Sequence, residues 1–169
     1  MIPDDQHLVL IGMMGVGKTT VSRIVGERLG RRVVDSDFVI EARTGRTVRE
    51  IFETDGEPAF RALETEALLE ALTDQEPLVI AAAGGVVLSE RNRTALRDSK
   101  SKVVWLCADP ATLVERVRSG GHRPLLDQDP AGMLQQMHEE RSPLYRQVAD
   151  AIVLVDGRSV SEIVEAVLR

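Results

Sequence analysis

Short, nearly continuous runs of apolar residues recur along the chain, and longer stretches with helical periodicity separate them. The runs cover residues 8–11, 32–35, 78–82, 102–106 and 151–155. Strands that are apolar on both faces are typical of parallel sheets covered by helices, whereas strands with one wet face alternate. The pattern therefore predicts a three-layer α/β fold, in which helices flank a five-stranded parallel sheet with right-handed crossovers.

Capping residues mark where several helices should begin. Thr47 and Ser159 are each followed three residues later by a glutamate, which is the pattern of a capping box. Asp-Pro pairs at 109–110 and 129–130 place a capping aspartate directly before a proline at the first helical position. We expect helices to begin at all of these places.

The first predicted strand leads into a glycine-rich stretch with the pattern G-x-x-x-x-G-K-T, formed by Gly12, Gly17, Lys18 and Thr19. Glycines let the backbone curl so that its N–H groups point at phosphate oxygens, and the helix that follows adds the positive end of its dipole. In this motif the lysine reaches the β- and γ-phosphates, and the threonine hydroxyl ligates Mg²⁺. A plain glycine-rich turn is the alternative, but it leaves the lysine and the threonine without a structural role.

Composition limits the classes of protein to consider. The 169 residues suffice for one domain with a sizeable core, so we expect a single domain over 1–169. The net charge of −6 and the lack of a basic cluster argue against nucleic-acid binding. Cys107 is the only cysteine, so no internal disulfide can form, and no stretch is apolar enough for a signal peptide or a membrane span. We expect a cytoplasmic monomer.

Two carboxylates follow the second predicted strand, in the sequence Asp35-Ser36-Asp37. Ligands of open parallel sheets bind beyond the carboxyl ends of the strands, so both carboxylates should face the same crevice as the phosphate loop. One of them can hold Mg²⁺ through water, and the other can orient or deprotonate an alcohol. Simple capping of the next helix by Asp35 or Ser36 is the alternative.

Arg61 and Glu64 lie one turn apart on a predicted helix. If this pair faces the crevice, Arg61 can bind a carboxylate in bidentate fashion while Glu64 holds the guanidinium in place. The alternative is an ordinary solvated surface pair. Gly84 and Gly85 close the third strand, where paired glycines indicate either close approach of a ligand to the backbone or a plain turn.

Glycines and a proline interrupt residues 119–127, between two predicted helices, and make this segment a candidate lid. Arg123 lies in it and could stabilise charge during phosphoryl transfer. Arg141 lies on a helix that we expect to end at residues 143–145, and Arg158 lies just before the last predicted helix. An ordinary surface charge is the default interpretation for both of these arginines.

The order of these motifs resembles that of the shikimate kinase family. The phosphate loop alone occurs in many nucleotide-binding families, but the later motifs are much more specific in combination. They are D-S-D at 35–37, F-R-x-x-E at 60–64, R-P-L-L at 123–126 and R-x-P-L-Y at 141–145. The resemblance covers residues 8–168 and implies a P-loop fold like that of nucleoside monophosphate kinases, with strand order 2-3-1-4-5, a shikimate-binding segment at 36–64 and a short lid.

The activity implied by the resemblance is ATP-dependent phosphorylation of the 3-hydroxyl of shikimate, a step toward chorismate and the aromatic amino acids. The implied shikimate-binding residues are Asp37, Arg61, Gly84 and Arg141, with both arginines on the carboxylate. The implied ATP-binding residues are Gly15, Val16, Gly17, Lys18, Thr19, Thr20, Arg123 and Arg158, with Arg158 beside the adenine. Thr19 would ligate Mg²⁺ with Asp35 behind it, and the implied catalytic residues are Asp37, Lys18 and Arg123.

Two departures from the family pattern and two rival functions bear on this interpretation. Ala83 replaces the first of three glycines, and the lid is short. A kinase of gluconate or of a nucleoside monophosphate would share the phosphate loop, but two arginines for one carboxylate and Asp37 for a hydroxyl favour a hydroxy acid. A GTPase-type switch would need an N-K-x-D motif and a D-x-x-G after a strand, and the D-x-x-G at 129–132 starts a predicted helix instead.

Overall fold

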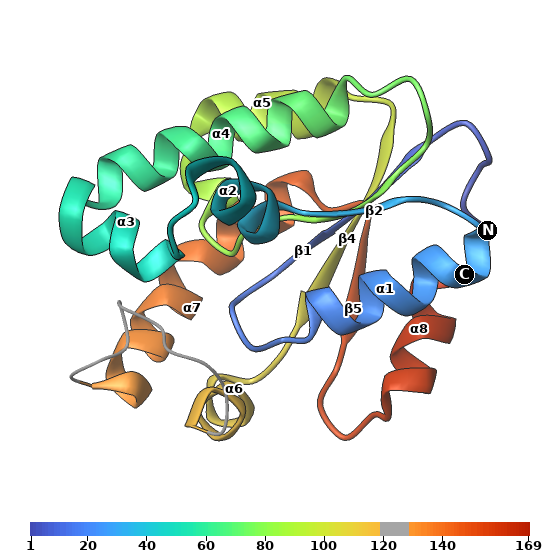
Figure 1. The fold of residues 1–169 in the computed structure, drawn as a ribbon. Helices are drawn as coiled ribbons and strands as arrows, with labels where there is room; N and C mark the ends of the chain where they lie inside the picture. Colours follow the sequence, from blue (N-terminus) through green and yellow to red (C-terminus); the bar gives the residue numbers. More distant parts are fainter. Residues whose placement is uncertain (119–128) are drawn as a thin grey trace.

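A computed structural model describes residues 1–118 and 129–169 of the chain (Figure 1). Five parallel strands form one sheet in the order β2-β3-β1-β4-β5. The strands are β1 (His7–Ile11), β2 (Val33–Asp35), β3 (Val79–Ala81), β4 (Ser101–Cys107) and β5 (Ala151–Leu154). The predicted fold class and strand order are confirmed, and each predicted apolar run differs from its strand by no more than one residue at either end.

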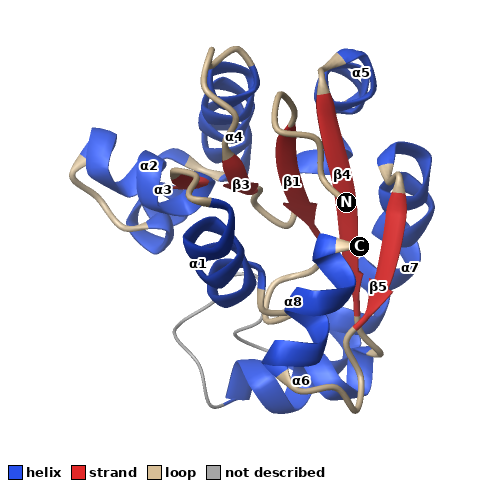
Figure 2. Cartoon of the chain, turned by 90° about the vertical axis from the view of Figure 1, so that its right-hand side faces the viewer, coloured by secondary structure: helices blue, strands red, loops and turns tan. Residues whose placement is uncertain are grey.

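Helices cover both faces of this sheet. α1 (Lys18–Leu29) and α8 (Val160–Leu168) pack together on one face, whereas α4 (Glu57–Leu72), α5 (Glu90–Asp98) and α7 (Pro130–Val148) lie on the other (Figures 1 and 2). The remaining helical segments are α2 (Ser36–Thr44), α3 (Val48–Asp55), η1 (Val86–Leu88) and α6 (Pro110–Arg118). Among the described residues, no helix combines the length and apolar character that crossing a bilayer would require.

The central strand explains why the apolar runs do not alternate. Every residue of β1 is buried, because helices cover both faces and neighbouring strands cover both edges. Val9 lies opposite Ile80 of β3 and Val103 of β4, so three apolar strands meet in register at the middle of the core. A polar residue on either face of β1 would therefore be buried without water.

The predicted helix starts are confirmed. Thr47 and Ser159 each accept a hydrogen bond from the backbone N–H of the glutamate three residues later, and that glutamate accepts one in return. Asp129 caps α7 by accepting from the N–H of Gly132 at 3.1 Å, and α6 begins at Pro110. These short-range signals are reliable because a capping side chain bonds only to its own first turn.

The expected end of the helix that carries Arg141 is wrong. α7 continues through Pro143 to Val148 instead of ending at residues 143–145. A proline inside a helix removes one backbone hydrogen bond and costs about 3 kcal/mol. Here Tyr145 and Val148 are buried against the core beyond the proline, and their packing outweighs that local penalty.

The helices α2, α3 and α4 pack around a small apolar cluster of their own. Its buried members are Ile40, Ile51, Phe60 and Ala67, which are separate from the main core. Phe52 packs against Phe60 with 4.8 Å between the ring centroids. This unit projects beside the carboxyl ends of the strands, so it forms one wall of any binding site at that edge of the sheet (Figure 1).

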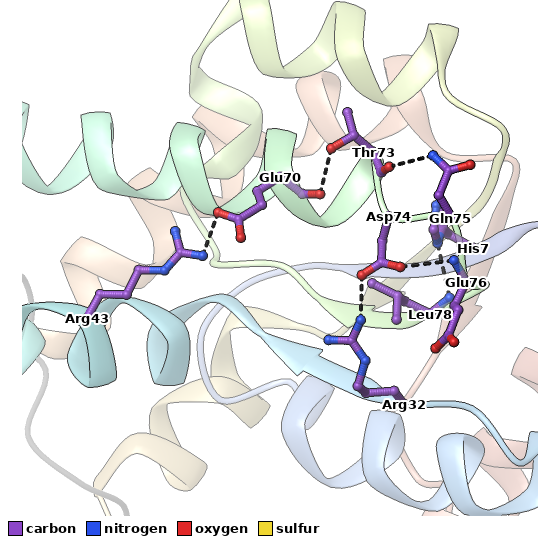
Figure 3. A network of polar contacts seen from close by, with 9 residues as sticks. All are labelled: His7, Arg32, Arg43, Glu70, Thr73, Asp74, Gln75, Glu76 and Leu78. Carbon is purple, nitrogen blue, oxygen red and sulfur yellow. Dashed lines mark hydrogen bonds and ion pairs between the residues drawn. The ribbon is translucent and has the colours of Figure 1, made fainter.

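Near the amino ends of the strands, polar side chains pair with one another and with the backbone (Figure 3). Arg32, just before β2, pairs with Asp74 at the end of α4. The backbone N–H of Leu78 donates to Nδ1 of His7 at 3.0 Å, which places the imidazole proton on Nε2. Both chain termini lie at this end of the sheet, side by side in both views (Figures 1 and 2).

Candidate active site

The loop between β1 and α1 is curled by glycines that no other residue could replace without strain. Gly12, Gly15 and Gly17 have φ values of 145°, 80° and 104°, which side-chain-bearing residues rarely adopt. A Cβ atom on Gly12 would also lie 2.4 Å from the carbonyl oxygen of Leu106 in β4. The loop therefore stays close to the sheet only because position 12 is glycine.

Lys18 begins α1 and directs its ammonium group into this curl. Its Nζ donates to the carbonyl oxygens of Gly12 at 2.6 Å and Met13 at 3.1 Å. The N-cap of α1 is Gly17, and no described side chain caps the helix, so the first N–H groups open onto the crevice. A fixed ammonium and a row of N–H groups on one concave surface suit a phosphate chain.

Thr19 and Asp35 meet at the mouth of this loop. The Thr19 hydroxyl donates to Oδ2 of Asp35 at 2.7 Å, and Oδ1 of Asp35 accepts from the backbone N–H groups of Asp37 and Phe38 at 3.0 and 3.4 Å. Asp35 thus caps α2 and at the same time reaches the phosphate loop. The capping interpretation is correct, but it does not exclude a second role for the other carboxylate oxygen.

The side-chain oxygens of Thr19 and Asp35 fit a magnesium ion that takes most of its other ligands from water and from a bound phosphate chain. Among the described residues, no cluster of three or more His, Cys, Asp or Glu side chains could hold a metal ion. Mg²⁺ does not need such a cluster, because it commonly keeps several waters and takes phosphate oxygens alongside one or two protein oxygens. The Thr19 hydroxyl and the Asp35 carboxylate, 2.7 Å apart beside the loop, are the donors of the right chemistry.

A cavity of about 640 Å³ opens in front of the phosphate loop. Its walls include the predicted residues Gly15, Gly17, Lys18, Thr19, Thr20, Asp35 and Asp37. α2 and α3 supply the opposite wall through Phe38, Glu41, Thr47, Val48 and Arg49. The position matches the expectation that ligands of a parallel sheet bind beyond the carboxyl ends of its strands.

A smaller cavity of about 70 Å³ adjoins the first one. The predicted acceptor-binding residues Asp37, Arg61, Gly84 and Arg141 all line it, although they come from four separate segments of the chain. The two cavities have common walls formed by Met14, Asp37, Val48, Ala83 and Gly84. A ligand in the smaller cavity therefore lies directly beside a phosphate chain in the larger one.

Arg61 is held in this cavity by two carboxylates of its own helix. Its Nη1 lies 2.7 Å from Glu64, and its Nη2 lies 3.0 Å from Glu57. Its guanidinium also lies over the ring of Phe60, 5.6 Å from the centroid. Burial opposes the positive charge, but Glu64 and Glu57 outweigh it and raise the pKa of Arg61. The pair is therefore not a solvated surface pair.

Glu64 is the least exposed charged side chain at this site, with 2% of its surface accessible. Burial raises the pKa of its carboxyl group, the negative charge of Asp37 adds to the rise, and the positive charges of Arg61 and Arg141 oppose it. Arg141 itself is 3% exposed, and its Nε has no hydrogen-bond partner among the described residues. A buried guanidinium donor of this kind is costly unless a ligand accepts from it.

The paired glycines after β3 let both arginines approach the backbone. A Cβ atom on Gly85 would lie 1.9 Å from Nη1 of Arg61, which is impossible without moving the side chain. A Cβ atom on Gly84 would lie 3.4 Å from the backbone nitrogen of Met14 and 3.6 Å from Nη1 of Arg141. The glycines make room for these two arginines, and the close approach of a ligand to this backbone stays a prediction.

Comparison with known proteins decides the family. A family model described as shikimate kinase matches residues 14–169. The chain belongs to the shikimate kinase family. A shikimate kinase of Symbiobacterium thermophilum is 44% identical over 165 residues, which cover 96% of this chain and 94% of that protein. One from Burkholderia lata is also 44% identical, over 163 residues that cover 96% of this chain and 88% of the relative.

A solved structure supports the same family membership. A shikimate kinase from Acinetobacter baumannii in complex with shikimate superimposes on this chain with a TM-score of 0.91 and 36% sequence identity. The match covers 96% of this chain and 90% of the solved chain. The likeness therefore extends over the sheet, the flanking helices and the segments that surround both cavities.

Some of the residues expected from the shikimate kinase resemblance do not lie in either cavity wall. Arg158 lines a separate hollow beside α8, together with Ser161 and Glu165. Val16 is buried beneath the phosphate loop and does not form part of its surface. Arg123 and the predicted lid at 119–127 lie outside the described residues.

Other residues at the site of this shikimate kinase family member were not identified from the sequence. Nη1 of Arg116 in α6 donates to the carbonyl oxygens of Val16 at 3.1 Å and Gly15 at 3.4 Å, so α6 braces the phosphate loop. An arginine in the last turn of a helix is usually explained by the helix dipole, and no local signal distinguishes this one. Phe52 and Phe60 also line the smaller cavity, and Phe60 is the first residue of the F-R-x-x-E motif, which was the available signal.

Proposed function

We propose that the two adjoining cavities carry out the reaction of the shikimate kinase family, with ATP in the larger cavity and shikimate in the smaller one. The reaction transfers the γ-phosphoryl group of ATP to the 3-hydroxyl of shikimate in aromatic biosynthesis. One observation carries the assignment of the site. Four segments far apart in the sequence bring Asp37, Arg61, Gly84 and Arg141 to one cavity that opens onto the phosphate loop.

The nucleotide side of the site is the loop from Gly15 to Thr20. Its backbone N–H groups and the Lys18 ammonium would hold the phosphates, and Lys18 would stabilise the charge that grows on the transferring phosphoryl group. Thr19 and Asp35 would hold Mg²⁺, which supplies neutralisation of phosphate charge when bound. The hydrogen bonds that already fix Lys18 and Thr19 support this proposal, because they reduce the cost of organising the site.

On the acceptor side, Arg61 and Arg141 would bind the shikimate carboxylate. Two buried or half-buried guanidinium groups face one cavity of about 70 Å³, and among the described residues only Arg61 forms an ion pair with carboxylates of the protein. A bound carboxylate would accept from the buried Nε of Arg141 and supply the partner that this donor lacks among the described residues. The shikimate complex of the Acinetobacter baumannii relative, which superimposes closely, supports the same choice of acceptor.

Asp37 would accept a hydrogen bond from the reacting hydroxyl. It lines both cavities, so a group bound to it lies between the acceptor and the phosphate chain. The carboxylate would orient the hydroxyl for in-line attack and could also take its proton as transfer proceeds. In a loose, dissociative transition state the orientation would contribute more than the proton transfer.

Several expectations from the sequence stay predictions. Arg123 would contact the phosphates from a lid over 119–127, and Arg158 would lie beside the adenine. We also propose that the protein is a cytoplasmic monomer with one kinase domain over residues 1–169. Arg123→Ala should lower kcat more than it weakens shikimate binding, and steady-state kinetics would separate the two effects.

An ADP-release assay with shikimate, gluconate and nucleoside monophosphates side by side tests the proposed function. We expect turnover with shikimate and ATP that exceeds turnover with the other acceptors by orders of magnitude. Comparable turnover with gluconate would contradict the acceptor assignment, because gluconate also presents a carboxylate and hydroxyl groups. Tight GTP binding without a phosphorylated small molecule would instead support a switch of the GTPase type.

A further inference from the structure

Tyr145 carries a polar group in the core, beside the smaller cavity, which is called the acceptor cavity below. It lies in α7 and is fully buried. Its hydroxyl donates to the carbonyl oxygen of Gly84 at 2.5 Å, across 61 positions of sequence. Gly84 is one of the residues that line the acceptor cavity, so this bond ties α7 to the wall of the site.

Arg141 lies one helical turn earlier on α7, near the same hydroxyl. Its positive charge opposes the rise in the pKa of Tyr145 that burial causes. Nη1 of Arg141 would also lie 3.6 Å from a Cβ atom on Gly84. The phenol therefore bonds to one component of the acceptor cavity, the carbonyl of Gly84, and lies within the electrostatic influence of another, the guanidinium of Arg141.

Packing alone does not explain why this residue carries a hydroxyl. The ring of Tyr145 packs on Trp105 with 5.5 Å between centroids, and a phenylalanine ring would make the same contact. A buried hydroxyl is unfavourable unless it is hydrogen-bonded, so its presence indicates that its bond to the Gly84 carbonyl matters. Burial, only partly offset by Arg141, raises the pKa of Tyr145 to about 12, so the phenol remains a donor at neutral pH.

We propose that Tyr145 is a positioning residue for the acceptor: its hydroxyl holds the guanidinium of Arg141 and the carbonyl of Gly84 in the orientation that the shikimate carboxylate requires. This inference rests on the proposed assignment of Arg141 to that carboxylate. Tyr145 itself does not line the acceptor cavity, so it acts through its two partners. The phosphate loop is held by its own bonds, including those of Lys18, and should be little affected.

Tyr145→Phe is the direct test, because it keeps the ring on Trp105 and removes only the hydroxyl. We expect the KM for shikimate to rise about 10-fold, as for the loss of a hydrogen bond to a charged group, while kcat and the KM for ATP change less than about 2-fold. Ser142→Ala is the matched control, since Ser142 lies on the same helix and its hydroxyl bonds back to the His138 carbonyl one turn earlier. It should change neither KM.

A double-mutant cycle separates this inference from the proposed function. Arg141→Ala should weaken shikimate binding by itself, and adding Tyr145→Phe to it should then weaken binding by less than about 2-fold. If Arg141→Ala leaves shikimate binding intact, the assignment of Arg141 is wrong and the proposed acceptor site fails. If Arg141→Ala weakens binding but Tyr145→Phe does not, or costs the same in both backgrounds, the positioning role is overturned.

A spectroscopic measurement on the unmutated sequence covers the case in which Tyr145→Phe does not fold. Tyr145 is the only tyrosine among the 169 residues, so biosynthetic incorporation of 3-fluorotyrosine labels this position alone. We expect its ¹⁹F resonance to shift on saturation with shikimate and to stay in place with an analogue that lacks the carboxylate. A resonance unchanged by saturating shikimate, or shifted equally by the analogue, would overturn the inference.

Discussion

The two ends of the parallel sheet are built from similar residue types but arranged in opposite ways. At the amino ends, charged and polar side chains are paired with one another and with the backbone (Figure 3). At the carboxyl ends, glycines bring the backbone and buried charges close together, and the buried Nε of Arg141 has no hydrogen-bond partner in the described part of the chain. The first arrangement is satisfied within the chain, whereas we propose that ligands complete the second.

The amino end illustrates polar groups that serve the fold. Arg32, just before β2, pairs with Asp74, just beyond the end of α4 (Figure 3). Asp74 also accepts from the backbone N–H of Glu76 at 2.9 Å, which shapes the turn before β3. Most of these side chains are well exposed, so each pair contributes little to stability and can change without consequence for the site.

The carboxyl end illustrates polar groups that serve binding. Glu64 and Arg141 are almost completely buried there, next to Asp37 and Arg61. Buried charges destabilise a fold unless they are paired and hydrogen-bonded, so their presence at one cavity indicates a ligand. The contrast shows that burial and missing partners, rather than the number of charges, locate the functional end of this sheet.

The largest expected effect contrasts two lysines from opposite ends. Lys18→Ala should lower kcat by about 10³–10⁵-fold, the range for a cation that stabilises charge at a transferring phosphoryl group. Thermal melting and circular dichroism should match those of the parent, because Lys18 is not part of the core. Lys100→Ala removes a lysine that pairs with Asp5 on the exposed surface and is the matched control. Equal activities of the two variants would contradict the assignment of Lys18 and its loop to phosphate binding.

The second prediction separates the two carboxylates at the end of β2. Asp37→Asn should slow turnover by about 10²–10⁴-fold if Asp37 acts as a general base, and by less if it only orients the hydroxyl. ATP and Mg²⁺ affinities should hold, because the proposed Mg²⁺ donors are Thr19 and Asp35. Turnover that survives in Asp37→Asn but collapses together with Mg²⁺ binding in Asp35→Asn would leave Asp37 without a catalytic role.

The third prediction concerns the two arginines of the acceptor cavity. Arg61→Ala and Arg141→Ala should each cost about 1.5–3 kcal/mol of shikimate binding, as for a charge-assisted hydrogen bond. ATP binding should change little, and an acceptor without a carboxylate should be insensitive to both substitutions. Isothermal titration with each ligand checks this. Weakened ATP binding with intact shikimate binding in Arg61→Ala would reverse the assignment of the two cavities.

The fourth prediction tests the amino end by pH. Burial lowers the pKa of His7, although Asp74 opposes this, so the folded protein holds the imidazole neutral. Its contribution to stability is therefore present above the unfolded pKa of about 6.5 and is lost as the pH falls below that value. The melting temperature of the parent should fall between pH 7.5 and 5.5 more than that of His7→Asn, which keeps an acceptor for Leu78. Parallel curves for the two proteins would show that His7 does not titrate in this range.

The smallest expected effect concerns an exposed ion pair that lines neither cavity. Arg43→Ala removes an exposed ion pair with Glu70 and should cost less than about 1 kcal/mol of unfolding free energy. Kinetic constants for both substrates should equal those of the parent. A measurable change in the KM for shikimate would mean that losing the ion pair at Glu70 alters the position of Arg61 on the same helix.

Local signals in the sequence predicted most of the fold. The capping boxes at Thr47 and Ser159 formed as expected, because each involves only residues within one turn. The end of α7 was predicted wrongly for the opposite reason. Pro143 is a local signal for a helix end, but the burial of Tyr145 and Val148 depends on residues far away in the chain.

The sequence by itself determined the five strands, their order through the family resemblance, and the phosphate loop with Lys18 and Thr19. These follow from periodicity and from chemistry confined to short segments. Only the tertiary structure decided that Glu64 is buried near two arginines, that Gly85 leaves room for Arg61, and that Arg116 bonds to the phosphate loop and Tyr145 to Gly84. Each of these facts is a contact between distant segments, and burial and pKa shifts arise only when such segments exclude water together.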